Sequence, residues 1–466
     1  MIPQLREGTS RLELAPRWER LRFWSLAALL IACFLFGGAS RNDVASLVVL
    51  QPLAVICATV VLLSPGPIAW RSVRIPLLLL GAFASIMAIQ LVPLPPEVWT
   101  SLPGHEQFAR QAEVIGLQQP WRGISLTPDL TLASLIGLVT PFAILIGFGS
   151  LPREKTRNLL SIIILAASLG AFTGLAQLAG GASSPFYFYE TTNLDSAVGL
   201  FSNRNHQAVL LAMMWPMLAV WVTLPAEPRF FAAKRWIAAS MGVFILPMLV
   251  VSGSRAGIAL GALSLLAAFF IWRQRGEAMS APSRWASLLA PTALAAGATV
   301  LIATIVLSRD LAVQRLTNMS FDEESRIQLL PTLTRVAWDF FPVGAGFGSF
   351  DPLFRTYEPF EALRPSYLNH AHNELVEIAI EGGFASLAVL AVFLIWLCAR
   401  AVSVLRADAA GRTATFARLG LVMIVITMLS SLVDYPLRTP LMASVIAIAS
   451  GWLSAYDRRA RRSAAD

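Results

Sequence analysis

The residue types best suited to acid–base chemistry are concentrated in one short segment, 369–377, with the sequence NHAHNELVE. Two of the protein's four histidines, His370 and His372, lie in this segment. A neutral imidazole can take a proton from a hydroxyl group near pH 7, so these histidines are candidate general bases. If a helix begins near His370, three carboxylates follow on one face, and one of them would orient an imidazole. These carboxylates are Glu374, Glu377 and Glu381.

Other interpretations of this segment stay open. Histidines and acidic residues at the start of a helix also cap its free N–H groups and match its dipole. The pair His370 and His372 is a further candidate for metal binding, but no third ligand follows at helical spacing. We therefore expect no metal, and we expect His370, Asn373 and Glu377 to contact a substrate.

A second set of residues, all arginines, lies where apolar runs meet polar segments. They are Arg204, Arg255, Arg326 and Arg438. An arginine held near the membrane usually has a partner, and a guanidinium group matches phosphate in a bidentate way. The alternatives are snorkelling to the interface and pairing with a nearby acid, as Arg438 would do with Asp434 four residues earlier. We expect Arg204, Asn205, Asp434 and Arg438 to bind substrate.

The composition shows which kind of element must position these residues. The chain has 466 residues, of which 56% are hydrophobic and only 14% charged, and its mean hydropathy is +0.65. A soluble domain has about 25% charged residues. A soluble enzyme, a disordered scaffold and a disulfide-rich secreted module are therefore excluded. The sequence predicts an all-α integral membrane protein.

Twelve apolar segments have a length near the ~20 residues that a helix needs to cross a bilayer. They lie near 23–39, 44–63, 75–94, 130–149, 158–180, 206–224, 236–252, 256–273, 286–307, 374–399, 417–433 and 438–456. The first segment has small residues after it, as a signal peptide does, but its arginine-rich lead is long for that. An uncleaved first span is the better interpretation.

The basic residues predict the orientation of the spans. With loops alternating between sides, 24 of the 36 Lys and Arg residues fall on the side of the two termini, and the other 12 fall opposite. Loops rich in Lys and Arg stay in the cytoplasm, so both termini are predicted to be cytoplasmic. The net charge of +8 then serves to orient the protein, and nucleic acid is not expected as a partner.

This topology divides the chain into five parts, which are a basic cytoplasmic N-terminus at 1–22, nine spans at 23–307, a large periplasmic loop at 308–373, three spans at 374–456 and a basic tail at 457–466. The large loop carries acidic, basic, aromatic and glycine residues together. Long loops of such mixed composition usually have a function. A periplasmic site has no access to ATP or nucleotide sugars, so an enzyme there needs an energised substrate supplied by the membrane.

No cofactor is expected. The glycine-rich stretch at 343–350 looks like a dinucleotide fingerprint, but it lacks the helix of a βαβ unit and lies outside the cytoplasm. A turn that packs closely or approaches a substrate is the better interpretation. The three cysteines, Cys33, Cys57 and Cys398, lie in apolar runs and indicate neither a disulfide framework nor a metal site.

Taken together, these features resemble the O-antigen ligase and O-antigen polymerase superfamily of bacterial envelope glycosyltransferases. The family pattern His-[Asn/Ser/Gln]-x9-Gly-x-x-[Gly/Thr/Tyr] maps onto His372, Asn373 and Gly383, whereas its last position is Ser386 here. Two arginine motifs of the family resemble 254–257 and 325–326, and the stretches 201–205 and 434–436 also look like family motifs.

The resemblance implies a metal-independent, inverting transferase in the inner membrane with a C-type glycosyltransferase-like architecture. Its donor would be an oligosaccharide on undecaprenyl pyrophosphate. By this analogy Arg255 and Arg326 hold the pyrophosphate, and His372 deprotonates or orients the hydroxyl group of the acceptor. Further partners would be the lipid bilayer and proteins of polysaccharide export or chain-length control.

Several functions stay open at this point. A polymerase adding to another glycan is favoured, because Ser386 departs from the ligase pattern. The alternative is a ligase whose acceptor is lipid A core or a protein. A multispan transporter or lipid flippase is the rival from another class, but transporters place ionisable groups near the membrane midplane, whereas here they cluster at outer helix ends. A non-catalytic assembly partner would have no evident use for these histidines and arginines.

Overall fold

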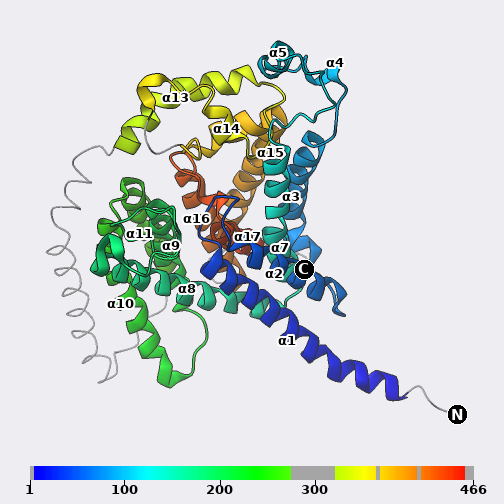
Figure 1. Ribbon diagram of the computed structural model, residues 1–466. Coiled ribbons are helices and arrows are strands. Elements are labelled where there is room, and N and C mark those ends of the chain that lie inside the picture. The colour runs from blue at the N-terminus through cyan, green and yellow to red at the C-terminus, as the bar shows by residue number, and fades with distance from the viewer. Residues whose placement is uncertain (1–4, 274–320, 364–367, 407–410, 457–466) are drawn as a thin grey trace.

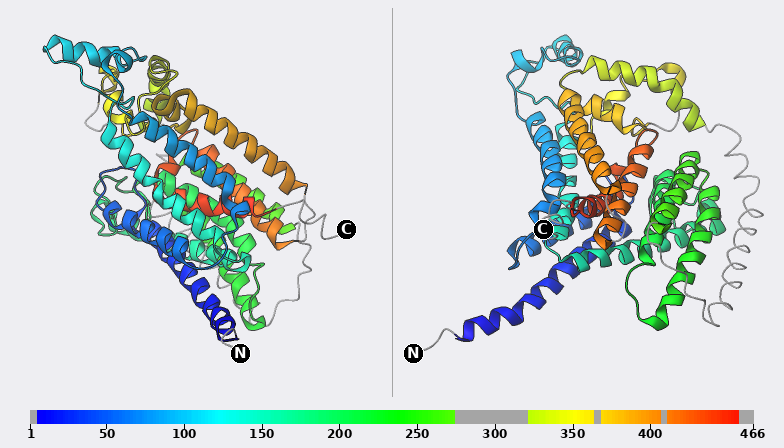
Figure 2. Two further views of the ribbon diagram at one scale, coloured as in Figure 1. Left: turned by 90° about the vertical axis from the view of Figure 1, so that its right-hand side faces the viewer. Right: turned by 180° about the vertical axis from the view of Figure 1, so that it is seen from behind.

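The computed structural model describes residues 5–273, 321–363, 368–406 and 411–456. Within these ranges the regular structure is helical, and an isolated bridge between Leu94 and Arg122 is the one β contact. The predicted all-α class is confirmed for this part of the chain. Figures 1 and 2 show a bundle of long helices with a layer of shorter helices at one end.

Seven helical segments are long and apolar enough to cross a membrane. They are α3 (Trp70–Gln90), α6 with α7 (Pro128–Gly137 and Val139–Gly149), α8 (Arg153–Gly180, continued by η1, Gly181–Ser183), α10 (Pro228–Ser252), α11 (Arg255–Arg273), α15 (Glu374–Leu405) and α16 (Arg412–Ser430). The other bundle helices are α1 (Leu5–Phe36), α2 (Leu47–Leu63), α9 (Arg204–Trp221) and α17 (Pro440–Ser454).

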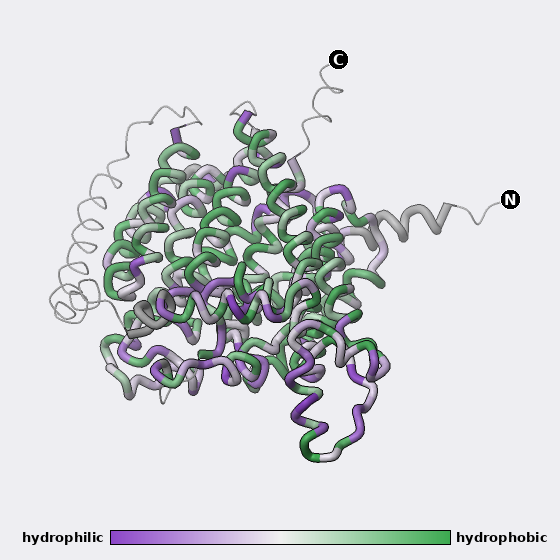
Figure 3. The backbone as a smooth tube through the Cα atoms, turned by 90° about the horizontal axis from the view of Figure 1, so that it is seen from above, coloured by the Kyte–Doolittle hydropathy of each residue, from purple (hydrophilic) through white to green (hydrophobic). Residues whose placement is uncertain are grey.

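Eleven of the twelve expected spans overlap these bundle helices. The remaining expected span, 286–307, lies outside the described residues. The count of twelve therefore stays a prediction, as does the division of the chain into five parts. What the structure shows is a bundle of apolar helices, and the bundle appears predominantly hydrophobic when viewed from above (Figure 3).

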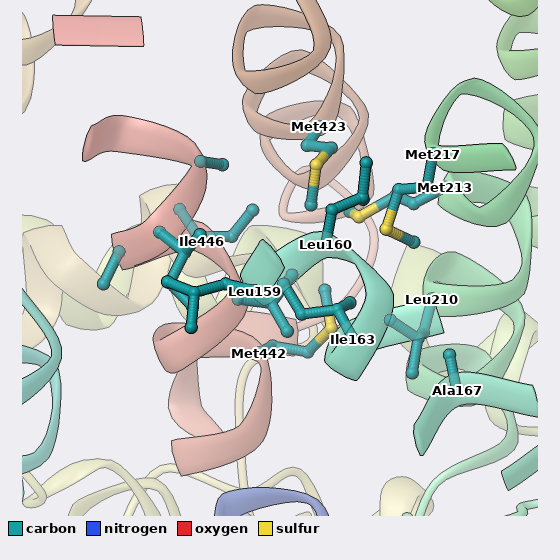
Figure 4. Packing of buried hydrophobic residues seen from close by; sticks show 14 of the residues in the cluster. Leu159, Leu160, Ile163, Ala167, Leu210, Met213, Met217, Met423, Met442 and Ile446 are labelled. Carbon is teal, nitrogen blue, oxygen red and sulfur yellow. The ribbon is translucent and has the colours of Figure 1, made fainter. Parts of the chain in front are cut away.

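The core of the bundle is formed where α8, α9, α16 and α17 meet. Figure 4 shows Leu159, Leu160 and Ile163 of α8 packed among side chains of the other three helices. Met213 and Met423 are completely buried there. Methionine side chains fill irregular gaps well, so this core can hold helices that cross at different angles.

Further helices lie at one end of the bundle, where a small second core is formed. They are α4 (Pro96–Trp99), α5 (Glu106–Val114), α13 (Phe321–Asp339), α14 (Phe350–Phe354) and η2 (Phe360–Ala362). Side chains from α13 and α14, among them Leu333, Phe350 and Phe354, pack with Ala371 and Ile380. The segment that carries α4 and α5 thus lies at the same end as α13 and α14 from the large loop predicted at 308–373, as Figure 1 also shows.

Loops that were predicted to share a side of the membrane do lie together. At one end, Ser202 N donates to Gly38 O over 3.2 Å, and Leu441 N donates to Gly37 O over 2.9 Å. At the other end, the Arg22 guanidinium donates to carbonyl oxygens of two loops, including Ser64 O at 2.6 Å. The pairing agrees with the predicted alternation, while the side of the membrane that each end faces stays a prediction.

Helix α15 is the element that connects the bundle to the second core. It changes direction at Gly383, whose φ of 56° and ψ of −148° are not helical. A Cβ atom there would lie 2.2 Å from Pro342 O, and a Cβ at Gly344 would lie 2.5 Å from Glu381 O. Glycine at both positions lets the turn at 342–346 pack directly on the helix, so the glycine-rich stretch packs closely.

We predict that Gly383→Ala destabilises the protein by roughly 2 kcal/mol or more, since this backbone region is essentially restricted to glycine and the added methyl would overlap Pro342. The thermal unfolding midpoint in detergent measures the effect. Gly81→Ala is the matched control, because Gly81 lies in helix α3 and a Cβ added there would meet nothing within 4 Å beyond the neighbouring backbone of its own helix. Equal unfolding midpoints for the two variants would contradict the account of this junction.

Candidate active site

The candidate general base His372 is held by an aspartate that lies 62 residues later in the sequence. His372 Nδ1 and Asp434 Oδ1 are 3.1 Å apart. The Asp434 side chain is almost fully buried, at 2% exposure, whereas the His372 side chain is 14% exposed. The imidazole is therefore anchored at one nitrogen and retains partial access to the outside.

The charge on Asp434 determines which nitrogen of His372 carries the proton. Burial raises the pKa of Asp434, but the neighbouring His206 and His372 side chains lower it by a larger amount. This pKa therefore lies well below 3.8. An ionised carboxylate only accepts hydrogen bonds, so His372 Nδ1 must be the donor. In the neutral ring Nε2 is then free of its proton and can accept one, as a general base requires.

The backbone at His372 has an unusual conformation that the start of α15 holds in place. His372 has a φ of 50°, in the left-handed region that non-glycine residues rarely adopt. The next residue, Asn373, caps α15, with its Oδ1 accepting from Leu375 N at 3.1 Å and Val376 N at 3.2 Å. The cap fixes the start of the helix, and Glu374 N donates to Ser431 O over 2.9 Å. The unusual backbone at His372 is thereby held from the helix side.

The second histidine belongs to a different, buried network. His370 Nδ1 and Glu377 Oε1 are 2.7 Å apart, and Glu377 Oε2 accepts from Ala371 N at 2.8 Å. Arg438 Nη2 lies 3.3 Å from Glu377 Oε1 and 2.8 Å from Glu381 Oε2. Burial lowers the pKa of Arg438, but the three carboxylates around it raise that pKa more, so the group stays charged.

The expectation that a carboxylate of α15 orients an imidazole is confirmed, since Glu377 pairs with His370, while the partner of His372 is Asp434. The alternative in which Arg438 pairs with Asp434 is wrong, because Arg438 contacts Glu377 and Glu381. The spacing of four residues suggested a helix at 434–438, whereas the chain forms only a 3-10 turn there, η3 (Pro436–Arg438). The substrate-binding roles of these residues stay predictions.

Helices α9 and α11 bring the other candidate arginines to the same end. Arg255 begins α11, after Ser254, whose Oγ accepts from Gly257 N at 3.0 Å. A Cβ on Gly257 would lie 2.4 Å from Ala208 Cβ, so α11 packs closely on the first turns of α9. Arg255 therefore lies near the start of α9, where Arg204 is the first residue.

The remaining candidates are placed less completely. Asn205 lies in the first turn of α9, and its backbone N donates to the capping side chain of Asn203 over 2.8 Å. Arg326 lies on α13, but its side chain is outside the described part of the structure. Whether Arg326 reaches the other arginines stays a prediction. In the described residues no group of three or more His, Cys, Asp and Glu side chains is arranged to hold a metal ion.

Two residues of the site were not among those predicted from the sequence. Tyr435 packs its ring against His370, His372 and His206, with ring centroids 4.2, 4.8 and 5.0 Å away. His206 Nε2 lies 3.8 Å from Asp434 Oδ1. The only sequence signal was their position beside motif residues, Tyr435 after Asp434 and His206 after Asn205.

Comparison with known protein families supports the resemblance. A family model described as O-Antigen ligase matches residues 239–391, about a third of the chain. No curated protein matches the chain. The matched segment contains Arg255, Arg326 and His372, three residues for which the resemblance implied a role. The resemblance to the O-antigen ligase and O-antigen polymerase superfamily is thus confirmed over residues 239–391.

Proposed function

We propose that this protein is an inverting, metal-independent membrane glycosyltransferase that joins a glycan carried on undecaprenyl pyrophosphate to a hydroxyl acceptor. The family match supports an enzyme of the O-antigen ligase and polymerase type, and the seven apolar helices support a multi-pass membrane protein. The observation that carries the proposal is the pair formed by His372 and the buried Asp434 at one end of the bundle.

In the proposed reaction the acceptor hydroxyl oxygen attacks the anomeric carbon of the donor sugar. The new glycosidic bond forms as the bond from that carbon to the pyrophosphate oxygen breaks, and the leaving group keeps the electron pair. The hydroxyl proton passes to His372 Nε2, since Nδ1 is committed to Asp434. Asp434 stays ionised and stabilises the imidazolium that forms.

The leaving group is an anion, so the proposal assigns it to cationic side chains. Arg255 and Arg326 would hold the pyrophosphate through bidentate hydrogen bonds and stabilise the charge that develops on it. The position of Arg255 at the start of α11, beside the first turns of α9, supports its part in this assignment. Arg204, Asn205 and Asn373 would contact the glycan or its phosphates.

The site is proposed to face the periplasm of a bacterial inner membrane, with both termini in the cytoplasm. The arginine distribution supports this orientation, and the grouping of loops at the two ends agrees with it. A donor embedded in the membrane meets the requirement for an energised substrate where no nucleotide is present.

A polymerase, which adds to another glycan of O-antigen or exopolysaccharide type, is favoured over a ligase. The supporting observation is Ser386, where the ligase pattern has Gly, Thr or Tyr. Ser386 is completely buried beside Gly382. A transporter or flippase is disfavoured, because the titratable residues described above gather at one end of the bundle.

His372→Ala should lower glycan transfer by about 10²- to 10⁴-fold, because the hydroxyl group loses its proton acceptor. The assay uses purified protein in detergent with undecaprenyl pyrophosphate-linked repeat units and follows both released undecaprenyl pyrophosphate and a glycan ladder. Membrane abundance should match that of the unsubstituted protein. A normal ladder from this variant would refute the general-base role.

Asp434→Asn should lower transfer by roughly 10²-fold or more, because a neutral amide neither fixes the proton on Nδ1 nor stabilises the imidazolium. The lowered pKa of Asp434 also has a consequence for stability. Its contribution is present above about pH 4 and is lost as the pH falls through the folded-state pKa. The unfolding midpoint of the variant should therefore depend less on pH below 4. Unchanged glycan transfer by this variant would refute the proposed role of Asp434 in orienting His372 and stabilising its imidazolium.

Arg255→Lys tests bidentate contact with the pyrophosphate. The charge is kept and the planar fork is lost, so transfer should fall by roughly 10²-fold. Arg110→Lys is the matched control, since Arg110 is exposed on α5 and pairs with Glu106 over 3.5 Å. Equal rates for the two variants would contradict a bidentate role for Arg255.

The same assay separates the proposed functions. A ladder from the lipid-linked donor alone identifies a polymerase. An inactive donor mixture that becomes active on addition of lipid A core or an acceptor protein identifies a ligase. Inactivity with every acceptor would overturn the glycosyltransferase proposal and favour the transporter.

A further inference from the structure

A third histidine, His206, lies against the proposed catalytic pair and has no part in the proposed reaction. It is in the first turn of α9 and is completely buried. Its ring stands edge-on between the rings of Phe201 and Tyr435, with centroids 6.0 and 5.0 Å away and interplanar angles of 76° and 86°. These two aromatic rings fix the direction in which the His206 nitrogens point.

His206 directs one nitrogen at the same carboxylate oxygen that holds His372. His206 Nε2 is 3.8 Å from Asp434 Oδ1, and His372 Nδ1 is 3.1 Å from that oxygen. Asp434 Oδ1 also accepts from Tyr435 N at 3.0 Å. Asn203 Nδ2 approaches the other oxygen, at 3.5 Å. One buried carboxylate is therefore shared between two imidazole rings.

Burying the His206 imidazole lowers the stability of the fold, so a functional role would explain why a histidine is at this position. Within the described residues neither ring nitrogen has a partner at hydrogen-bond distance. A buried polar group without such a partner costs about 1–3 kcal/mol, and an apolar side chain of similar size would avoid that cost. The aromatic packing alone does not explain a histidine, because phenylalanine would supply it equally well.

We propose that His206 is a positioning residue that sets the basicity of His372 through the carboxylate they share. The inference rests on the proposed function of His372 as general base. Asp434 must hold the ring of His372 in place, but a carboxylate without competing contacts would also retain the imidazolium strongly. A second imidazole at the same oxygen draws off part of its negative potential. His372 then takes up and releases its proton closer to neutral pH.

His206 itself transfers no proton in this scheme, and its Nε2–H stays directed at Asp434. The acceptor O–H bond breaks, the proton passes to His372 Nε2, and the same nitrogen later releases it to the outside. Asp434 stays an anion throughout. This agrees with the low pKa of Asp434, which burial raises but which His206 and His372 lower by more.

Few other charged groups face this cluster. Asp434 and Tyr435 contact His206 directly, and His370 and His372 pack on the far parts of the Tyr435 ring. Farther from His206, behind His370, the three carboxylates of Glu374, Glu377 and Glu381 surround Arg438. On α9 itself the nearest charged residue is Arg204, and α11 brings Arg255. In α8, α10 and α16, which also pack on α9, the charged residues lie at the other end of each helix.

The test is the pH dependence of glycan transfer by the full-length protein. His206→Phe keeps the aromatic packing and removes the group that faces Asp434. The acid limb of the rate profile should then move up by roughly one pH unit, because Asp434 holds the imidazolium of His372 more firmly. Transfer at pH 6 to 7 should fall several-fold and recover at higher pH. A uniform loss at every pH would mean that His206 only supports the structure, and would overturn the proposal.

Two further variants keep the test decisive. His206→Gln places an amide N–H where Nε2 stands, so its acid limb should stay near that of the unsubstituted protein. His206→Asn keeps the polarity with a side chain too short to reach Asp434, so its limb should move as in His206→Phe, and it serves if the phenylalanine variant does not accumulate. If the acid limbs of the glutamine and asparagine variants lay at the same pH, the proposal would be overturned.

His105→Gln is the matched control at a buried histidine away from the site. The nitrogens of His105 lie 3.0 Å from Pro103 O and 2.7 Å from Ile124 O, in the second core. This variant can lower stability, but its acid limb should not move. Failure of the unsubstituted protein to transfer glycan would refute the proposed function, whereas an active protein with an unmoved limb in His206→Phe would refute this inference alone.

Discussion

The pairing of Arg438 with two buried carboxylates is the interaction on which the rest of the site depends. Glu377 and Glu381 are completely buried in the first turns of α15, where uncompensated charge would cost several kcal/mol. One guanidinium from the turn before α17 contacts both. Glu381 also accepts from Gly348 N through its side chain at 2.8 Å, and its backbone oxygen accepts from Gln90 at 2.8 Å. Removing Arg438 would therefore disturb four separate segments of the chain at once.

This network fixes the two ends of the proposed catalytic pair relative to each other. His372 precedes α15, and Asp434 lies four residues before Arg438, so the ion pairs hold together the two segments that carry them. The left-handed backbone at His372 is unfavourable by itself, and it is kept because Asn373 caps the helix on one side and Asp434 holds the ring on the other. A surface ion pair would be too weak for this task, since exposed pairs contribute about 0–1 kcal/mol.

The sequence predicted the elements better than the contacts between them. Eleven of the predicted spans overlap helices of the bundle, because an apolar stretch of about 20 residues has few alternatives in a membrane. The candidate site segments were also found, since histidine and arginine are conspicuous beside apolar runs. The partners were not found. The carboxylate that orients His372 lies 62 residues away, whereas helical spacing pointed only to Glu374, Glu377 and Glu381, of which Glu377 pairs with His370. Spacing reports neighbours on one helix, whereas this pair is formed by two segments that the fold brings together.

His206 was not predicted for the same reason, because its role depends on a residue from another segment of the chain. A lone histidine in the first turn of an apolar helix is ordinary in sequence, and its meaning depends on the carboxylate opposite it. Asp434 receives His372 from the segment before α15, and His206 and Asn203 approach it from the start of α9. The matched family segment, 239–391, contains His372 but neither Asp434 nor His206. The residues that would set the basicity of His372 therefore come from parts of the chain on both sides of that segment, and the bundle as a whole is needed to assemble them.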